Sequence, residues 1–308
     1  MKWIKKGLIA GVIDKINWAI SHAQIPTLLV KKDRLRVYFA SRPSNDITLT
    51  TFCDLDLEDF SRVLYVHPEP ILKLGEPGTF DQYGIMPSSV IEKDGLIYLF
   101  YSGWSRSVGV PYSNYTGIAI SEDGGTTFVK KFRGPVLDRT KFEIFSATSP
   151  EVYYDGKWHM WYCSGTNWHL VDKKFEHTYD IKYASSEDGL NWQQHNQSAI
   201  HQKNEFEAIT KPTIIKIGEK YHMWYCYRGT INFRGGENAY RIGYADSDDM
   251  MHWTRKDENA GIGITEGEWD DKMMAYPAIT KINGEIVMFY NGNEFGKKGF
   301  GYATLKNI

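Results

Sequence analysis

The stretch that decides the fold is SPEVYYDGKWHMWYCSG at residues 149–165, because its pattern returns as KPTIIKIGEKYHMWYCYRG at residues 211–229. Each copy contains a proline, a short apolar strand, a tight turn and a second strand rich in aromatic residues. Three further copies lie outward from this pair, and the five prolines stand at positions 26, 87, 150, 212 and 277. A period of 61 to 65 residues indicates a repeat in which each copy is one supersecondary unit.

Every copy also carries signals for two more strands. The third strand ends in a turn of small and acidic residues, and an aromatic residue then opens the fourth strand. Examples are the turns at 121–124, 186–189 and 247–249, followed by Phe128, Trp192 and Trp253. Asp-Gly pairs favour two-residue hairpins, as at Asp94-Gly95 and Asp155-Gly156. Four antiparallel strands in each of five copies predict an all-β, five-bladed β-propeller.

The two ends of the chain complement each other. The last copy stops after its third strand, at residues 299–305, whereas residues 3–6 resemble the openings of fourth strands at 128–131 and 253–256. An N-terminal strand that completes the last blade would remove an open sheet edge. We therefore predict one domain over residues 1–308. Its expected blades are 18–70, 80–137, 143–200, 205–260, and 269–308 plus 1–10.

Composition narrows the function. The 308 residues carry 36 Lys and Arg against 38 Asp and Glu, which lacks the basic excess of a nucleic-acid-binding protein. No apolar stretch approaches the length of a membrane span, and the three cysteines form no CxxC motif. We expect a soluble cytoplasmic protein. The sequence contains no HExxH, P-loop or GxSxG motif, so neither a metal nor a cofactor is predicted.

Acidic residues precede the repeated prolines. In a propeller, these segments converge at one mouth of the central channel, which is the expected ligand site. An aromatic–acid pair stands five to seven residues before four of the prolines. The repetition fits a structural role, with the acid capping a turn, and equally a ring of carboxylates from which two act as general acid and base. The candidate catalytic residues are Asp81, Glu143, Glu207, Asp270 and Asp271.

The candidate binding residues lie in the loops between second and third strands, which differ between copies, and in the segments before the prolines. Aromatic faces stack on sugar rings, and forked donors and acceptors take the hydroxyls, so this composition is typical of saccharide recognition. The number of arginines favours an anionic group such as a carboxylate or phosphate. The predicted residues are His22, Gln24, Arg42, Trp104, Arg106, Asn167, Trp168, Lys211, Arg228, Tyr276, Asn291 and Asn293.

The whole chain resembles the five-bladed propeller enzymes of glycoside hydrolase families 43, 32 and 130. The resemblance rests on Trp158-His-Met-Trp-Tyr162, on Ser186-Glu-Asp-Gly189 with Trp192, and on the closing segment from 268–270 to 290–293. Within that group the chain is most similar to uncharacterised glycosyl-hydrolase-like proteins. Families 43 and 32 imply acids beside the first-strand prolines. Here those positions hold Ile25, Met86, Ser149, Lys211 and Tyr276, which leaves Glu207 as the best candidate acid and Glu151 just past Pro150.

Three functions therefore remain open at the level of sequence. The first is a glycoside hydrolase that uses two of the candidate carboxylates. The second is a phosphorylase or glycosyl transferase, in which the resemblance to family 130 implies that phosphate is the nucleophile and one protein acid suffices. The third is a saccharide-binding propeller without turnover. The sequence predicts neither the sugar nor the oligomeric state.

Overall fold

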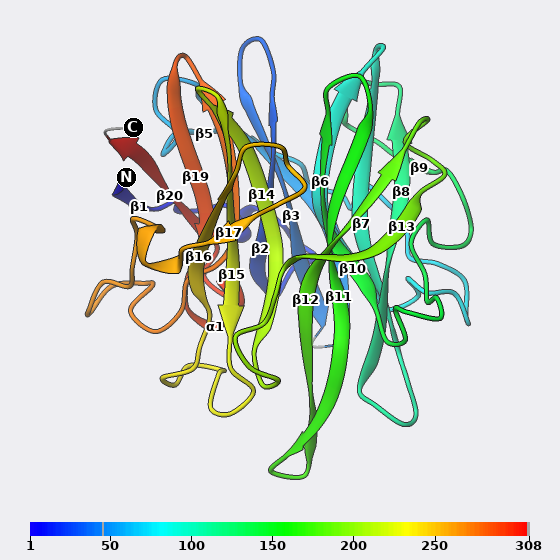
Figure 1. Cartoon of the computed structure of the whole chain (residues 1–308). Helices are drawn as coiled ribbons and strands as arrows, with labels where there is room; N and C mark the ends of the chain where they lie inside the picture. Colours follow the sequence, from blue (N-terminus) through cyan, green and yellow to red (C-terminus); the bar gives the residue numbers. More distant parts are fainter. Residues whose placement is uncertain (45, 307–308) are drawn as a thin grey trace.

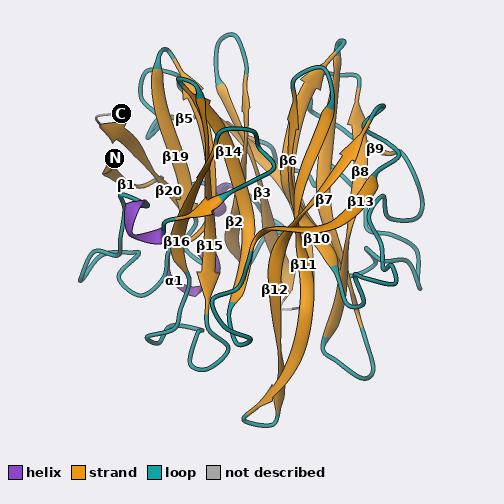
Figure 2. Ribbon diagram, viewed as in Figure 1, coloured by secondary structure: helices purple, strands orange, loops and turns teal. Residues whose placement is uncertain are grey.

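Antiparallel pairing joins the strands into five units of four, as the computed structural model of residues 1–44 and 46–306 shows (Figures 1 and 2). The first unit comprises β2 (Ser21–Val30), β3 (Leu35–Ser44), β4 (Ile47–Leu55) and β5 (Val63–Val66). The second comprises β6 (Gly84–Lys93), β7 (Leu96–Arg106), β8 (Tyr112–Ser121) and β9 (Val129–Lys130). The third comprises β10 (Ala147–Tyr154), β11 (Trp158–Val171), β12 (Lys174–Ser186) and β13 (Gln193–Ile200).

The fourth unit comprises β14 (Ala208–Ile217), β15 (Lys220–Arg228), β16 (Arg241–Ser247) and β17 (Thr254–Arg255). The fifth combines β18 (Ala275–Ile282), β19 (Glu285–Asn291) and β20 (Phe300–Lys306) with β1 (Lys2–Leu8) from the start of the chain. The helical segments are η1 (Ile13–Lys15), η2 (Asp257–Asn259) and α1 (Asn293–Gly296). No helix among the described residues has the length and apolar character needed to cross a membrane.

The first and last strands of the chain are neighbours. β1 pairs antiparallel with β20, with Trp3 opposite Leu305, and Figure 1 shows the two termini side by side. The prediction that the N-terminal strand completes the last unit is therefore confirmed. The pairing satisfies backbone groups along an edge of β20 that would otherwise be open to another chain.

Packing between the units follows the order of the chain and returns to its start. The first strands β2, β6, β10, β14 and β18 contact one another in sequence, and β18 also contacts β2. Apolar clusters fill each space between consecutive units. A further cluster joins the fifth unit to the first, with Phe289 and Phe300 against Phe39. The large aromatic residues of the second strands are thus buried between sheets, where they remove the most apolar surface from water.

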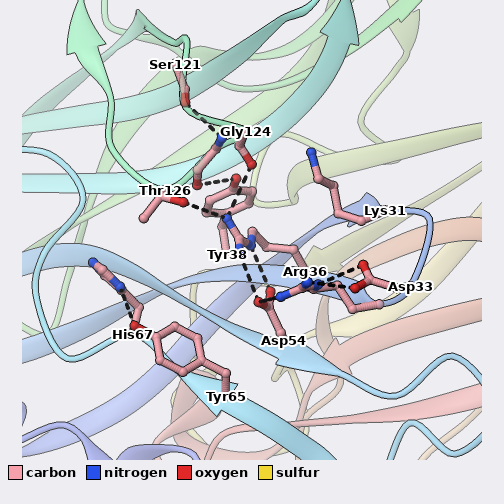
Figure 3. A network of polar contacts seen from close by, with 12 residues as sticks. Lys31, Asp33, Arg36, Tyr38, Asp54, Tyr65, His67, Ser121, Gly124 and Thr126 are labelled. Carbon is pink, nitrogen blue, oxygen red and sulfur yellow. Dashed lines mark hydrogen bonds and ion pairs between the residues drawn. The ribbon is translucent and has the colours of Figure 1, made fainter.

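A polar network also joins the first two units (Figure 3). The guanidinium of Arg36 donates to both carboxylate oxygens of Asp54, at 2.8 and 2.9 Å, and lies 3.8 Å above the Phe52 ring centre. The neighbouring Tyr38 hydroxyl donates to the carbonyl of Gly125, at 2.7 Å. A turn of the second unit is therefore held by hydrogen bonds to strand β3 of the first.

The turns correct one sequence prediction. Asp94 and Gly95 both have positive φ (52° and 77°) and form the predicted two-residue hairpin between β6 and β7. The Ser-Glu-Asp-Gly segments do not form such hairpins. In the second unit, the Asp123 carboxylate accepts from the amides of Thr126 and Thr127, which shapes a longer loop before β9.

The first strands carry a bulge at the repeated proline. Pairing with the second strand shifts there in every unit. In four units the residue before the proline has positive φ, namely Ile25 (57°), Ser149 (49°), Lys211 (52°) and Tyr276 (55°). Such a conformation is costly for a residue with a Cβ and persists only where the surrounding structure enforces it. The bulges set the direction of these side chains at the axial end of the units.

Candidate functional site

An axial cavity of about 290 Å³ lies where the five units meet. Four of the residues before the prolines line it, namely Ile25, Met86, Ser149 and Tyr276. The third strands supply much of the rest of the wall, with Tyr112 and Asn114 on β8, Tyr179 on β12 and Tyr240 just before β16. Residues far apart in sequence therefore meet at one site, to which every unit contributes at least one residue.

The wall of the axial cavity is rich in tyrosine. The hydroxyls of Tyr179 and Tyr240 lie 2.9 Å apart and share a hydrogen bond. Burial raises the pKa of Tyr112, Tyr179, Tyr240 and Tyr276 above the usual value, so all four remain neutral at physiological pH. A neutral phenol can both donate and accept a hydrogen bond while its ring offers an apolar face.

Three polar atoms of the axial cavity have no hydrogen-bond partner among the described residues. They are the indole nitrogen of Trp104, the amide oxygen of Asn114 and the hydroxyl of Thr148. A buried polar group without a partner is destabilising by roughly 1–3 kcal/mol, and in native proteins it usually bonds a water or a ligand. These three atoms are buried within the wall, so a ligand in the cavity would reach them only if the wall rearranged.

Arg42 brings a positive charge to the axial cavity. Its guanidinium donates to the side-chain oxygen of Gln24, at 3.1 Å, and Gln24 is buried against the sulfur of Met86. Burial lowers the pKa of Arg42, and burial followed by the charge of Arg42 lowers the pKa of nearby His22 to about 4. At neutral pH, His22 is uncharged and Arg42 carries the charge.

The predicted catalytic carboxylates lie elsewhere. Asp81, Glu143 and Asp270 are buried and each accepts a hydrogen bond from the tyrosine at the matching place in its own unit. These tyrosines are Tyr101, Tyr162 and Tyr290, at 3.0, 3.1 and 3.0 Å. Each carboxylate also forms an ion pair with a lysine of the same four-strand unit. The pairs are Asp81 with Lys130 at 2.6 Å, Glu143 with Lys182 at 3.2 Å and Asp270 with Lys5 at 2.5 Å.

Glu207 repeats this arrangement with an arginine. Arg255 donates to both of its carboxylate oxygens, at 2.7 and 2.8 Å, and also contacts Asp257. Asp257 in turn accepts from the hydroxyl of Tyr225, at 2.5 Å. Among the described residues that line the axial cavity, none is an aspartate or glutamate. The catalytic roles of these acids stay predictions, and the structure does not bring the acids together.

The first unit lacks both parts of this arrangement. Residues 19–21, which correspond to the aromatic–acid pair, are Ala-Ile-Ser. The second-strand position that holds Tyr101 in the second unit is occupied by Phe39, which has no hydroxyl. The tyrosine is therefore present in the four units that have the acid and absent in the one that lacks it. This association is expected if acid, tyrosine and cation stabilise each unit together.

The binding residues predicted from the loops divide into two groups. Arg42, Trp104 and Tyr276 line the axial cavity, whereas Arg106 pairs with Asp46 at the surface, at 2.7 Å. Several of these positions, placed in loops by the sequence, lie inside long strands. Asn167 and Trp168, for instance, belong to β11, whose hairpin with β12 reaches beyond the other strands at the lower edge of Figure 1.

Trp168 and the three predicted asparagines make contacts within the protein and do not line the axial cavity. Trp168 stacks on His177 with ring centres 4.1 Å apart, and exposed Asn167 accepts from the Trp168 amide. Asn291 is fully buried and bonds the backbone of residues 23 and 25, which links the last unit to the first. Asn293 accepts from the amides of residues 272 and 273, and donates to Asp271 at 2.6 Å.

Two buried cations lie next to the axial cavity without lining it. Arg228 donates to the Tyr179 hydroxyl, at 3.2 Å, and its guanidinium lies 3.8 Å from the ring centre of Phe233. Lys211 has its ammonium 3.9 Å from the carboxylate of Glu151. Burial lowers the pKa of Lys211 and raises that of Glu151. Within the described part of the chain, no cluster of three or more His, Cys, Asp and Glu residues is arranged to hold a metal.

Comparison with known proteins places the chain in a family. No family model matches it. Two curated Mycobacterium tuberculosis proteins, uncharacterized protein Rv1502 of strain H37Rv and uncharacterized protein MT1551 of strain CDC 1551, are 32% identical to it over 310 residues. The alignments cover all of this chain and all of each relative. The chain belongs to their family. A third curated protein, the beta-1,2-mannobiose phosphorylase of Thermoanaerobacter sp., is 28% identical over 158 residues, which is 49% of this chain and 47% of that protein.

Solved structures establish the fold. A glycoside hydrolase superposes with a TM-score of 0.76 at 18% identity, over 99% of this chain and 92% of its own. A thermostable family-43 glycoside hydrolase gives 0.68 at 16% identity, over 94% and 91%. The family-32 beta-fructofuranosidase BmSUC1 of Bombyx mori gives 0.60 at 14% identity, over 96% and 64%. The predicted resemblance to the propeller superfamily of these hydrolases is thus confirmed at the level of fold.

Several residues of the axial cavity were not predicted from the sequence. They include Asn114, Thr148, Tyr179 and Tyr240. Asn114 and Tyr240 lie at or just before the start of a third strand, Tyr179 lies within the third strand β12, and Thr148 lies on the first strand β10. Asn114 pairs with Trp104. Marking the start of each third strand in the repeat would have found Asn114 and Tyr240.

Proposed function

We propose that this protein is a carbohydrate-active enzyme that binds a saccharide in the axial cavity. The observation that carries the proposal is a cavity walled by four tyrosines, with Arg42 and Asn114 also in its lining. A sugar ring presents hydroxyls that can donate and accept, together with C–H faces that pack on aromatic rings. A volume of about 290 Å³ is at the lower end for ligand pockets and suits one or two sugar rings.

We further propose that the five units are the blades of one closed propeller formed by residues 1–308. The cyclic contacts of the first strands and the apolar cluster between the last unit and the first support this interpretation. Closure around an axis would explain why side chains from all parts of the sequence gather at one cavity. It also agrees with the superfamily of the solved structures that share the fold.

The chemistry within this class is a choice between hydrolysis and transfer to phosphate. Hydrolysis by the predicted pairs of carboxylates needs groups near the glycosidic bond, and Glu207 and the other three buried acids are held in ion pairs. The partial similarity to a mannobiose phosphorylase and the cationic wall at Arg42 support phosphorolysis as the second candidate. In that reaction phosphate would be the nucleophile, so fewer protein carboxylates would be required.

The test compares binding and turnover in one set of proteins. Thermal stabilisation by a panel of mono- and disaccharides would detect binding, and release of reducing sugar with and without phosphate would detect hydrolysis or phosphorolysis. Gly84→Ala is the diagnostic variant, because a Cβ there would overlap the indole nitrogen of Trp104. Displacing that ring is expected to weaken saccharide binding at least tenfold.

Gly134→Ala is the matched control, since a Cβ at Gly134 would contact nothing within 4 Å. It should bind saccharides as the unmodified protein does. Equal binding by the two variants would contradict the placement of the sugar at Trp104. Turnover that depends on phosphate would select phosphorolysis over hydrolysis, and binding without turnover under both conditions would contradict the enzyme assignment.

A further inference from the structure

Positive charge exceeds negative charge around the axial cavity. Arg42 lines it, Arg228 lies behind the wall formed by Tyr179 and Tyr240, and the buried ammonium of Lys211 follows Thr210, which also lines it. Within the described residues, the one carboxylate within 4 Å of any of these three cations is that of Glu151, at 3.9 Å from Lys211. Three cations therefore face one carboxylate.

The arginines predicted to bind a ligand are not equivalent. Arg106 pairs with Asp46, at 2.7 Å. Arg228 is enclosed by aromatic rings and donates to the carbonyls of His177 and Gly229. Arg42 alone among these lines the axial cavity, and in the described part of the chain its guanidinium contacts no carboxylate.

Arg42 is half-buried, and partial burial of an unpaired charge is unfavourable, because the guanidinium loses hydration without gaining a counterion. The guanidinium of Arg42 donates a hydrogen bond only to the neutral side-chain oxygen of Gln24 among the described side chains. The adjacent His22 is uncharged at neutral pH, because its pKa is lowered to about 4. Such a site is completed by an anion from outside the chain. A carboxylate or phosphate group can accept two parallel hydrogen bonds from a guanidinium, which is the strongest form of this contact.

We propose that the ligand of the axial cavity is an acidic saccharide whose carboxylate or phosphate group binds Arg42. The inference rests on the proposed function, and it names the class of sugar that the site accepts. Tyr276, next to Arg42 in the wall, can donate a further hydrogen bond to the same group because its hydroxyl stays protonated. The tyrosine rings of the wall can pack on the C–H face of the sugar.

The test measures ligand affinity by isothermal titration calorimetry in phosphate-free buffer. The probes are glucuronate and galacturonate for the carboxylate, glucose 6-phosphate and glucose 1-phosphate for the phosphate ester, inorganic phosphate alone, and glucose and galactose as neutral sugars. At least one acidic sugar should bind at least tenfold more tightly than its neutral counterpart. The preference should decrease as salt is added, because the contact is ionic.

The variants locate the charge. Arg42→Gln should lose the preference for the acidic sugar, whereas Arg42→Lys should keep part of it, because lysine retains the charge without the paired donors. Arg62→Gln, at the surface and paired with Asp56 at 3.3 Å, is the control and should leave both affinities unchanged. Thermal unfolding of each variant without ligand establishes that it is folded.

The outcomes separate this inference from the proposed function. Neutral and acidic sugars that bind equally, with no effect of Arg42→Gln, would overturn the inference and leave saccharide binding intact. Inorganic phosphate that binds through Arg42 while no sugar binds would contradict the proposed function and show that the anion is not part of a saccharide, which also overturns the inference as stated. Binding of acidic sugars that is unchanged in Arg42→Gln would place the anion elsewhere and overturn it as well.

Discussion

The four buried carboxylates that precede the repeated prolines are paired with cations, whereas the charged side chain in the axial cavity is not. In the second to fifth units, Asp81, Glu143, Glu207 and Asp270 each pair with a cation of the same sheet unit. At the axis, Arg42 lacks such a partner among the described residues, and several polar atoms of the wall are unpartnered. The four carboxylates recur with a cation partner, although Oδ1 of Asp270 accepts no hydrogen bond from the described residues, whereas Arg42 occurs once and has no carboxylate partner among them.

This difference teaches how to separate stability from function in a repeat protein. A group that recurs with its partner in every unit satisfies its own charge and needs no ligand. A group that occurs once, with no partner in the chain, leaves an energetic cost that a ligand can remove. The aromatic–acid pairs recur in four units, each with a cation nearby, which favours a structural role, and their catalytic role stays a prediction.

The largest effect is expected from Glu207→Gln. Removal of one partner of a buried ion pair lowers the free energy of unfolding by about 3–5 kcal/mol, and because Arg255 keeps Asp257 as a partner the loss should lie near the lower value. Urea unfolding would measure this loss. Glu205→Gln, two residues away and exposed, should change the stability little. Unchanged stability with abolished turnover would instead support a catalytic role for Glu207.

An effect of intermediate size is expected from pH, which should change the free energy of unfolding through the buried side chain of His177. Burial, followed by the charge of Arg228, lowers the pKa of His177 to about 3, against about 6.5 in an unfolded chain. Between these values the unfolded state binds the proton and the native state does not, so stability falls as the pH decreases below 6.5. The loss attributable to His177 should reach about 2 kcal/mol at pH 5.

The variant that tests this effect is His177→Phe, which keeps an aromatic ring stacked on Trp168. Urea unfolding at pH 7 and pH 5 should show a smaller pH-dependent loss in the variant than in the unmodified protein. His22, whose pKa is also lowered, would account for part of the dependence that remains. Identical pH dependence in the two proteins would mean that His177 is not held neutral.

The smallest effect is expected from Tyr101→Phe, which gives the second unit the residue found in the first. Asp81 would lose the hydrogen bond from the Tyr101 hydroxyl and keep its ion pair with Lys130. The loss of one hydrogen bond to a carboxylate is about 1.5–3 kcal/mol, and the remaining lysine should hold the effect near the lower value. Tyr98→Phe, in the same strand, is the control. A loss of unfolding free energy as large as that of Glu207→Gln would contradict the idea that the ion pair with Lys130 contributes more to the stability of Asp81 than the hydrogen bond from Tyr101.

Much of the fold was predictable because it depends on local patterns. The period of the prolines, the aromatic second strands and the similarity of residues 3–6 to other fourth strands led to the pairing of β1 with β20 that the structure confirms. The site was harder to predict. Arg42, Trp104 and Tyr276 were identified, but Tyr179, Tyr240 and Asn114 were not, because strand ends decide which side chains reach the axis.

The sequence by itself determined the repeating four-strand unit and the residues that each unit buries, because turn chemistry and alternating apolar positions act over a few residues. Only the tertiary structure decided which charges find partners. Ion pairs such as Glu207 with Arg255 and the solitary position of Arg42 depend on distances between segments that are remote in the chain. Electrostatic energy depends on those distances and on burial, and neither is encoded in the spacing of residues along the chain.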